Sequence, residues 1–189
     1  LLWPWSARRL RPSKAAERPS TPPALETWRQ HCKRLLAEPS DFPNVLQLTA
    51  CARDALQDCG MQRVLLLLAD RQHSRLQVQQ IAGLDKAALA LSLDPSNSQI
   101  LRRLLAQPGQ LRLSPENAAQ YSALLPGSLK ALFPSEHLLL RSIASNGRVV
   151  MLLAADQGGR AFNDISLQAF TKTVQCIERA LSHFAKRPR

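Results

Sequence analysis

The sequence of 189 residues lacks most of the patterns that mark enzymes and membrane proteins. No apolar run approaches the roughly 18 residues that a membrane-spanning helix needs. There is no glycine-rich phosphate loop and no Ser/His/Asp set, and the four histidines (His31, His73, His137 and His183) are scattered along the chain. We therefore expect a protein that is not an enzyme and that holds no cofactor.

Cysteines at metal-ligand spacing are also missing. Cys32, Cys51, Cys59 and Cys176 all fall in predicted helices, and the sequence contains no CxxC and no Cys/His ligand spacing. This argues against a metal site and against a disulfide framework, so we interpret them as buried free thiols of a cytoplasmic protein. The segment Leu1–Trp5 is too short for a signal peptide and has no basic region before it.

The formal net charge of +11 is concentrated at the two ends of the chain. Residues 1–23 carry a net +4 and residues 186–189 carry +3, which leaves +4 for the region between them. We interpret 1–23 as a Pro/Arg-rich linker to an upstream module, 24–185 as one domain, and 186–189 as a basic tail. The domain has no basic stripe with interleaved aromatics, so nucleic-acid binding is not expected. Salt-sensitive binding of polyanions or proteins by the basic tails is the alternative function.

Two predicted helices carry apolar residues at alternating spacings of three and four. The first is expected from about Pro23 to Glu38 and the last begins after Asn163 or Asp164. Such a seam either packs on the domain's own sheet or pairs with another helix, and we predict a homodimer through it. The candidate seam residues are Leu25, Trp28, Leu35, Leu167, Phe170, Val174, Ile177 and Leu181.

Asn146-Gly147 lies between two strand-like runs, 137–145 and 148–156, and is the strongest hairpin signal in the chain. A two-residue turn pairs Ser145 with Arg148, Arg141 with Leu152, and His137 with Asp156. Alternation then assigns the even-numbered residues 138–144 and the odd-numbered residues 149–155 to a face that packs on the terminal helices. The opposite face carries His137, Arg141 and Asp156, and we expect it to form a pocket or a partly wet surface.

Between these signals we expect a helix from about Asn44 (or Asp41) to Cys59 with Gly60 as its stop, and strands at 63–69 and 76–81. A helix capped by Ser96 or Asn97, a strand at 110–113 and an irregular connection over 114–134 follow. Three segments, 97–113, the hairpin, and 158–164, resemble those of GAF domains. In pattern the resemblance covers about Phe42 to Phe184.

The resemblance implies an α+β fold, in which a central antiparallel sheet of about five to six strands carries the N- and C-terminal helices on one face. It also implies a small-molecule pocket on the other face and a non-catalytic sensory or regulatory role in a signal-transduction protein. An HDOD-type module is the expected upstream neighbour. Phe162-Asn163-Asp164 departs from the pattern of cyclic-nucleotide-binding members. No cysteine lies between Cys59 and Cys176, which disfavours the bilin-binding and methionine-sulfoxide-reducing members.

Five residues are candidates for reading a small ligand: Arg141, His137, Tyr121, Arg112 and Asp156. An arginine in mid-strand needs a carboxylate, a phosphate-like ligand or water, or it reaches the sheet edge or a loop acid. His137 and Asp156 form a cross-strand pair in the predicted register, but no nucleophile accompanies them. Tyr121 lies on the loop that would close the pocket.

Overall fold

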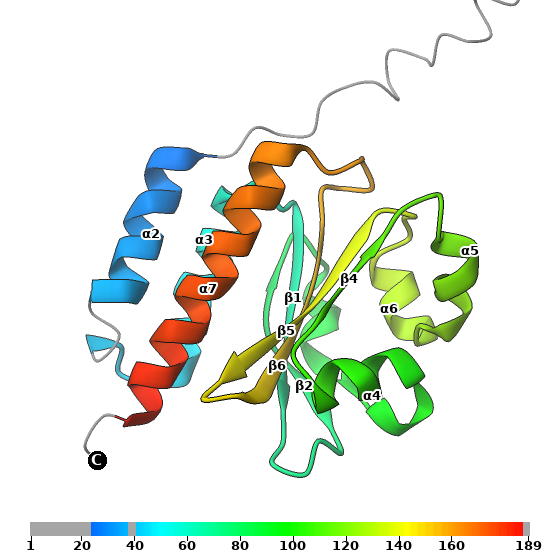
Figure 1. Ribbon diagram of the computed structural model, residues 1–189, viewed down its shortest axis with the longest axis horizontal. Coiled ribbons are helices and arrows are strands. Elements are labelled where there is room, and N and C mark those ends of the chain that lie inside the picture. Colours follow the sequence, from blue (N-terminus) through cyan, green and yellow to red (C-terminus); the bar gives the residue numbers. More distant parts are fainter. Residues whose placement is uncertain (1–23, 38–40, 187–189) are drawn as a thin grey trace, which may run out of the picture.

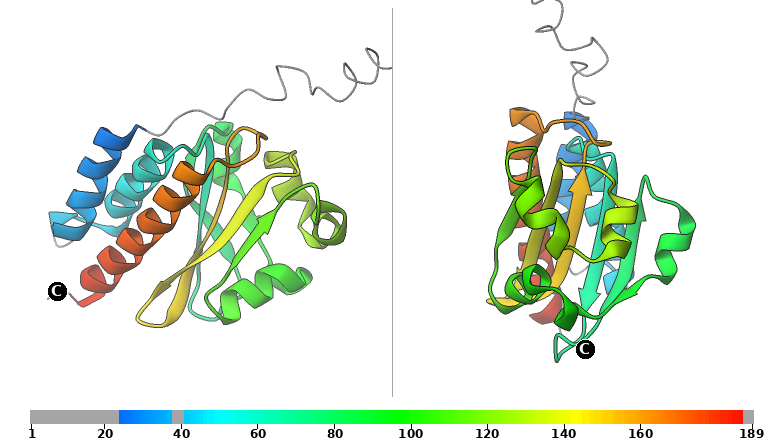
Figure 2. Two further views of the ribbon diagram at one scale, coloured as in Figure 1. Left: turned by 45° about the horizontal axis from the view of Figure 1, so that its top comes forward. Right: turned by 90° about the vertical axis from the view of Figure 1, so that its right-hand side faces the viewer.

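The computed structural model describes residues 24–37 and 41–186 and shows an antiparallel sheet between two groups of helices (Figure 1). The sheet has six strands in the order β3-β2-β1-β6-β5-β4. Helices α2, α3 and α7 cover one face, and α4, α5 and α6 lie at the other (Figures 1 and 2). The predicted α+β fold and the packing of both terminal helices on one face are confirmed.

The elements follow the predicted order closely. The strands are β1 (Arg63–Ala69), β2 (Leu76–Ala82), β3 (Ser92–Leu93), β4 (Gln110–Leu113), β5 (Leu138–Ser145) and β6 (Arg148–Asp156). The α-helices are α2 (Leu25–Ala37), α3 (Val45–Asp58), α4 (Gln99–Ala106), α5 (Ala118–Tyr121), α6 (Gly127–Leu132) and α7 (Asp164–Lys186). Short 3-10 turns are η2 (Lys86–Ala90), η3 (Pro95–Asn97) and η4 (Ser122–Leu124). The predicted linker 1–23 lies outside the described residues. No helix within those residues is long and apolar enough to cross a membrane.

Side-chain caps explain where the long helices start. The Asn44 side chain accepts a hydrogen bond from the Gln47 backbone N–H at 2.9 Å and so begins α3. Asn163 does the same for Ser166 N–H at 2.7 Å at the start of α7. The cap of α4 was predicted one or two residues early: it is Ser98, because η3 occupies the residues before it.

Two apolar cores lie on opposite faces of the sheet. We call α2, α3 and α7 together the helical layer. The core between this layer and the sheet includes Leu35 from α2, Leu48 from α3, and Phe170, Val174 and Ile177 from α7, all nearly without solvent exposure. The second core is made mainly of leucines from the sheet together with α4, α6 and the segments around them. Burial on both faces agrees with the continuous apolar run of β1.

The hairpin forms at the predicted turn, where Asn146 and Gly147 have φ of 54° and 80° and Ser145 pairs with Arg148. Ala144 also pairs with Val149 as this register requires, but beyond that pair the predicted register is wrong. Ile143 pairs with Met151 and Ala144 with Val149, so Val150 of β6 is the extra residue of a β-bulge. The pairing shifts by one residue there, and Arg141 lies opposite Leu153 rather than Leu152.

The bulge also exchanges the two faces of β5. Leu139 and Ile143 now pack on the helical-layer side, whereas Leu138 and Leu140, which were predicted there, belong to the opposite core. On β6 the prediction holds for Met151, Leu153 and Ala155 but not for Val149, which also lies in the opposite core. The predicted pair of His137 and Asp156 does not form, since His137 precedes β5 and Asp156 lies opposite Arg63 of β1.

Candidate functional site

Asp156 is completely buried at the end of β6 and is paired with Arg63 from the neighbouring strand. Arg63 Nε lies 2.9 Å from Oδ1 and 3.1 Å from Oδ2 of Asp156, and Nη2 lies 2.6 Å from Oδ2. The Gly158 backbone N–H donates to Oδ1 at 3.1 Å. The carboxylate is therefore held at both oxygens by groups of its own chain, which suits a structural ion pair better than a general base.

Two other candidates, Arg112 and His137, lie at the same end of the sheet around Phe162. The Arg112 guanidinium lies 5.8 Å from the centre of the Phe162 ring, and the His137 ring meets that ring edge-on at 6.5 Å. Phe162 is buried and directly precedes the cap of α7. These contacts tie the connection after β6 to β4 and to the start of β5, so their role in this structure is packing.

Arg141 and Tyr121 are not part of this group of side chains. Arg141 Nη1 donates to the side chain of Gln110 on the edge strand β4 at 3.0 Å, which matches the sheet-edge alternative rather than a ligand contact. Alternation along β5 places Arg141 on the same face as Leu139 and Ile143, away from the predicted pocket. Tyr121 ends α5 and packs against the leucine-rich core as a partly buried ring.

The sheet face on which a ligand was expected is filled by apolar side chains. Where β1, β5 and β6 meet α4 and α6, only about 10 Å³ of space remains. That space is no larger than the ~10–15 Å³ that one water molecule needs. Seven of its lining residues belong to the leucine-rich core: Leu67, Leu101, Leu104, Leu129, Leu140, Leu152 and Ala154. The other two, Arg141 and Leu153, border it from strand positions whose side chains alternate to the opposite face. The middle of this face therefore has no room for a small molecule. Hollows of about 410 Å³ beside α5 and α6 and of about 470 Å³ beside η3 and α4 lie among the segments that cover the same face.

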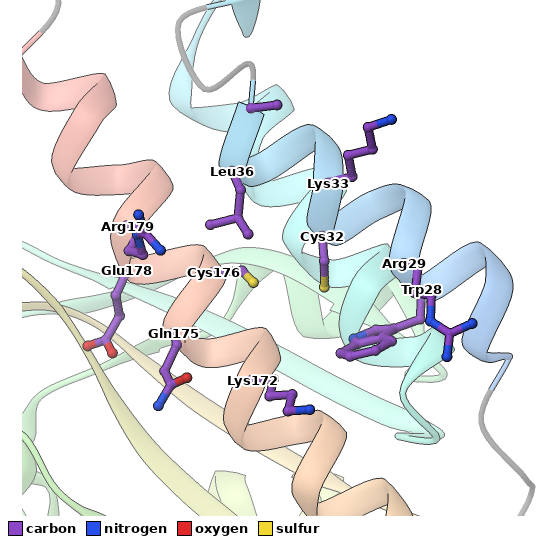
Figure 3. A pocket seen from close by; sticks show the side chains of 11 residues that line it. Trp28, Arg29, Cys32, Lys33, Leu36, Lys172, Gln175, Cys176, Glu178 and Arg179 are labelled. Atoms are coloured by element: carbon purple, nitrogen blue, oxygen red, sulfur yellow. The ribbon is translucent and has the colours of Figure 1, made fainter.

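A larger space lies on the opposite side of the molecule, between α2 and α7 (Figure 3). This groove has a volume of about 850 Å³. Trp28, Cys32 and Leu36 of α2 and Cys176 of α7 contribute to its apolar walls. Its charged lining residues are Arg29, Lys33, Lys172, Arg179 and Glu178, so four cations surround it with one carboxylate.

Most of the predicted seam residues pack inside the domain. Leu35, Phe170, Val174, Ile177 and Leu181 are buried in the helical-layer core, while Trp28 and Leu167 are partly buried against it and Leu25 is exposed. The Trp28 indole N–H donates to the Thr173 hydroxyl at 2.7 Å and links α2 to α7. The helices thus use the regular seam for their own core, and only their outer surfaces are free to meet another protein.

Cys32, Cys51 and Cys176 lie in α2, α3 and α7, as predicted, whereas Cys59 is the residue that ends α3. All four are free thiols, and three are buried as predicted, but Cys176 is partly exposed. Burial raises the pKa of Cys51 to about 11 and that of Cys59 to about 12. These two thiols are therefore unreactive at neutral pH. Among the described residues no group of three His, Cys, Asp or Glu side chains could hold a metal ion.

Reasoning from the sequence missed Arg63 and the pairing of Cys32 with Cys176 across the groove. A charged residue at the start of an otherwise apolar strand was the available signal for Arg63, since such a residue needs a partner. The cysteines are 144 positions apart in sequence, and only the packing of α2 on α7 brings them together.

No protein-family model matches the sequence, and no curated protein matches it. Solved structures do. A fragment of a methyl-accepting chemotaxis protein (residues 122 to 287) aligns with a TM-score of 0.68 and 16% identity over 85% of this chain and 98% of the other. A GAF domain/HD domain protein from Geobacter sulfurreducens aligns with a TM-score of 0.60 and 16% identity over 82% of this chain and 97% of the other. Free methionine-R-sulfoxide reductase from Neisseria meningitidis, solved with its substrate, aligns with a TM-score of 0.62 and 15% identity over 88% of this chain and 95% of the other.

These identities are too low to carry a function from one protein to another, but they agree on the architecture. Each alignment covers more than four fifths of this chain and nearly all of the other chain at a TM-score of 0.60 or above. The six-stranded antiparallel sheet of this chain, with both terminal helices on one face, matches the GAF-like α+β fold. The chain therefore has the fold of GAF domains.

Proposed function

We propose that this chain is a non-catalytic regulatory module of a signalling protein that works through protein contacts of α2 and α7, in the first place as a homodimer. The observation that carries the proposal is the contrast between the two sides of the sheet. On the face where a ligand was expected, only about 10 Å³ remains between the sheet and α4 and α6, and the hollows at the covering segments measure about 410 and 470 Å³. A groove of about 850 Å³ opens between the terminal helices.

Exposed apolar residues support the same surface. Seven large apolar side chains are exposed in the described part of the chain, and three of them, Leu25, Leu36 and Ile165, lie on α2 or α7. Leu46 on the adjoining α3 is a fourth. Of these four, Leu36 lines the groove itself. An exposed apolar side chain in a groove with a polar rim is typical of protein interaction sites.

The fold alone does not decide between a regulatory module and an enzyme, since one structural neighbour is a methionine-R-sulfoxide reductase. The position of the thiols favours regulation. All four cysteines of this chain belong to the helical layer, and none lies in the leucine-rich core beyond the sheet. A small ligand at the sheet would have to displace leucines of α4 and α6, and we regard it as secondary to protein contact.

The test is sedimentation equilibrium on the full chain with Leu36→Glu and a control, Leu89→Glu. Leu36 lines the groove and is 41% exposed, and Leu89 is 51% exposed on η2, which packs against β2. We expect the wild-type chain to dimerise. Leu36→Glu should weaken dimerisation at least ~10-fold, about 1.4 kcal/mol, and Leu89→Glu should leave it unchanged. A wild-type chain that stays monomeric at high concentration, or equal effects of the two substitutions, would overturn the dimer.

Salt gives an independent readout. Two copies meeting at this surface bring together rims that each carry Arg29, Lys33, Lys172 and Arg179. Because salt screens repulsion between exposed like charges, the dimer should become tighter as ionic strength rises. A dimer that dissociates in salt would contradict contact at this surface.

A further inference from the structure

Cys32 and Cys176 are brought together by the way in which α2 and α7 pack. The two helices run side by side in the same direction (Figures 1 and 2). The hydrogen bond from Trp28 to Thr173, at 2.7 Å, fixes their alignment. Cys32 lies one turn after Trp28 and Cys176 lies one turn after Thr173, so the next turn of each helix places the thiols together.

The geometry of the groove leaves one thiol of the pair open to solvent and the other protected. Both sulfur atoms are directed into the space between the helices (Figure 3). Cys32 is only 7% exposed, whereas Cys176 is partly exposed, and the groove of about 850 Å³ reaches both. A small reagent entering the groove therefore meets Cys176 and finds the second thiol beside it.

We propose that Cys176 and Cys32 form an oxidisable thiol pair, in which Cys176 is the site attacked by a hydroperoxide and Cys32 resolves the product as a disulfide between α2 and α7. The inference is independent of the proposed dimer, since it concerns a reaction within one copy of the chain.

The electrostatic surroundings separate the roles of the two thiols. A hydrogen bond from Cys32, assisted by the positive charge of Arg179, lowers the pKa of Cys176 to about 7. The same hydrogen bond, together with burial, raises the pKa of Cys32 well above its ordinary value. At neutral pH a larger fraction of Cys176 is therefore the nucleophilic thiolate than of an unshifted thiol. The other charged or titratable side chains that line the groove are Arg29, Lys33, Lys172 and Glu178.

The reaction balances with a hydroperoxide as the only oxidant. The Cys176 thiolate attacks the terminal peroxide oxygen, an S–O bond forms, the O–O bond breaks, and the alkoxide or hydroxide that leaves takes a proton from water. The Cys32 sulfur, on losing its proton, then attacks the Cys176 sulfur, so that an S–S bond forms and the S–O bond breaks. The departing hydroxide and the proton from Cys32 make water. Two thiols have supplied the two electrons that reduce the peroxide.

The experiment treats the full chain in dilute solution with one equivalent of hydrogen peroxide, followed by alkylation and peptide mass spectrometry without reductant. The wild-type chain should yield a Cys32–Cys176 cross-link within one copy that dithiothreitol reverses. Cys32→Ser should stop at a sulfenic acid on Cys176, which dimedone traps, and Cys176→Ser should give neither product. Cys51→Ser is the matched control and should behave as wild type, because Cys51 is buried and its pKa is raised.

Reactivity is read out separately from disulfide formation. At pH 7, Cys176 should react with iodoacetamide ~10-fold or more faster than Cys51 or Cys59. Equal rates at the three cysteines would overturn the role of Cys176. A sulfenic acid in Cys32→Ser with no cross-link in the wild-type chain would overturn the role of Cys32.

Discussion

Asp156→Asn is the substitution that most directly tests how the end of the sheet is held together. Asp156 has no solvent exposure, and it accepts three short contacts from the Arg63 guanidinium and one from Gly158 N–H. The substitution replaces one carboxylate oxygen by an amide NH2 group, which donates hydrogen bonds. This NH2 group would face the N–H donors of Arg63, and the negative charge that pairs with Arg63 would be lost. Removing one partner of a buried ion pair typically costs about 3–5 kcal/mol. Because the Arg63 side chain is 22% exposed, we expect the lower end, about 3 kcal/mol.

The free energy of unfolding is measured by urea denaturation followed by circular dichroism, with Asp54→Asn as the matched control. Asp54 pairs with Arg53 at 3.1 Å, but the two side chains are 40% and 30% exposed, and an exposed pair contributes about 0–1 kcal/mol. The Tm of Asp156→Asn should be about 6–12 °C lower than that of the wild-type chain, because 1 kcal/mol corresponds to ~2–4 °C for a domain of this size. A loss below about 1 kcal/mol, or one equal to that of Asp54→Asn, would refute the view that this pair secures β6 to β1.

Three further outcomes follow from single positions. Gly60→Ala should lower the free energy of unfolding by about 1–3 kcal/mol, measured by urea denaturation. Gly60 has φ of 114°, and an added Cβ would lie 2.3 Å from the Ser166 hydroxyl. The control Gly109→Ala, whose added Cβ would meet nothing closer than 3.6 Å, should be nearly neutral. Ser166→Ala should stabilise the domain by up to about 1 kcal/mol. Among the described residues, the Ser166 hydroxyl is the buried side-chain polar atom that lacks a hydrogen-bond partner. A loss of stability would contradict this. The alkylation rate of Cys176 should rise through pH 7 and level off above about pH 8 as its thiol, with a pKa lowered to about 7, becomes thiolate; a midpoint near pH 9 would refute the lowered pKa.

Local signals in the sequence were sufficient for most of the fold. Asn146 and Gly147 adopt the positive φ values that the turn requires. Asn44 caps α3 and Asn163 caps α7, each at a position where the sequence predicts a cap. These features depend on a few neighbouring residues, and each has one physical reason. The apolar seam of α7 was also evident, and it packs on the domain's own core.

Features that depend on a single inserted residue or on distant contacts were not predictable. The bulge at Ile143 and Ala144 has no signature such as glycine or proline, yet it moves Arg141 away from the predicted pocket and separates His137 from Asp156. A side-chain period of two makes this unavoidable, because one extra residue reverses every assignment beyond it. The partner of Asp156 comes from β1, 93 positions earlier in the chain, and no pattern within the hairpin could indicate it.

The distribution of space around the sheet argues for where a signal would enter or leave this domain. Leucines of α4 and α6 fill the middle of the face on which a ligand was expected, and opening a pocket there would sacrifice their buried area, at roughly 25 cal/mol for each Å². The groove between α2 and α7 needs no such rearrangement, since it is already open and presents Leu36 and the thiols of Cys32 and Cys176. Both a protein contact and an oxidation at this groove act on the relative position of the two terminal helices. Because α7 also packs on β5 and both terminal helices pack on α3, a change there reaches the sheet through existing contacts.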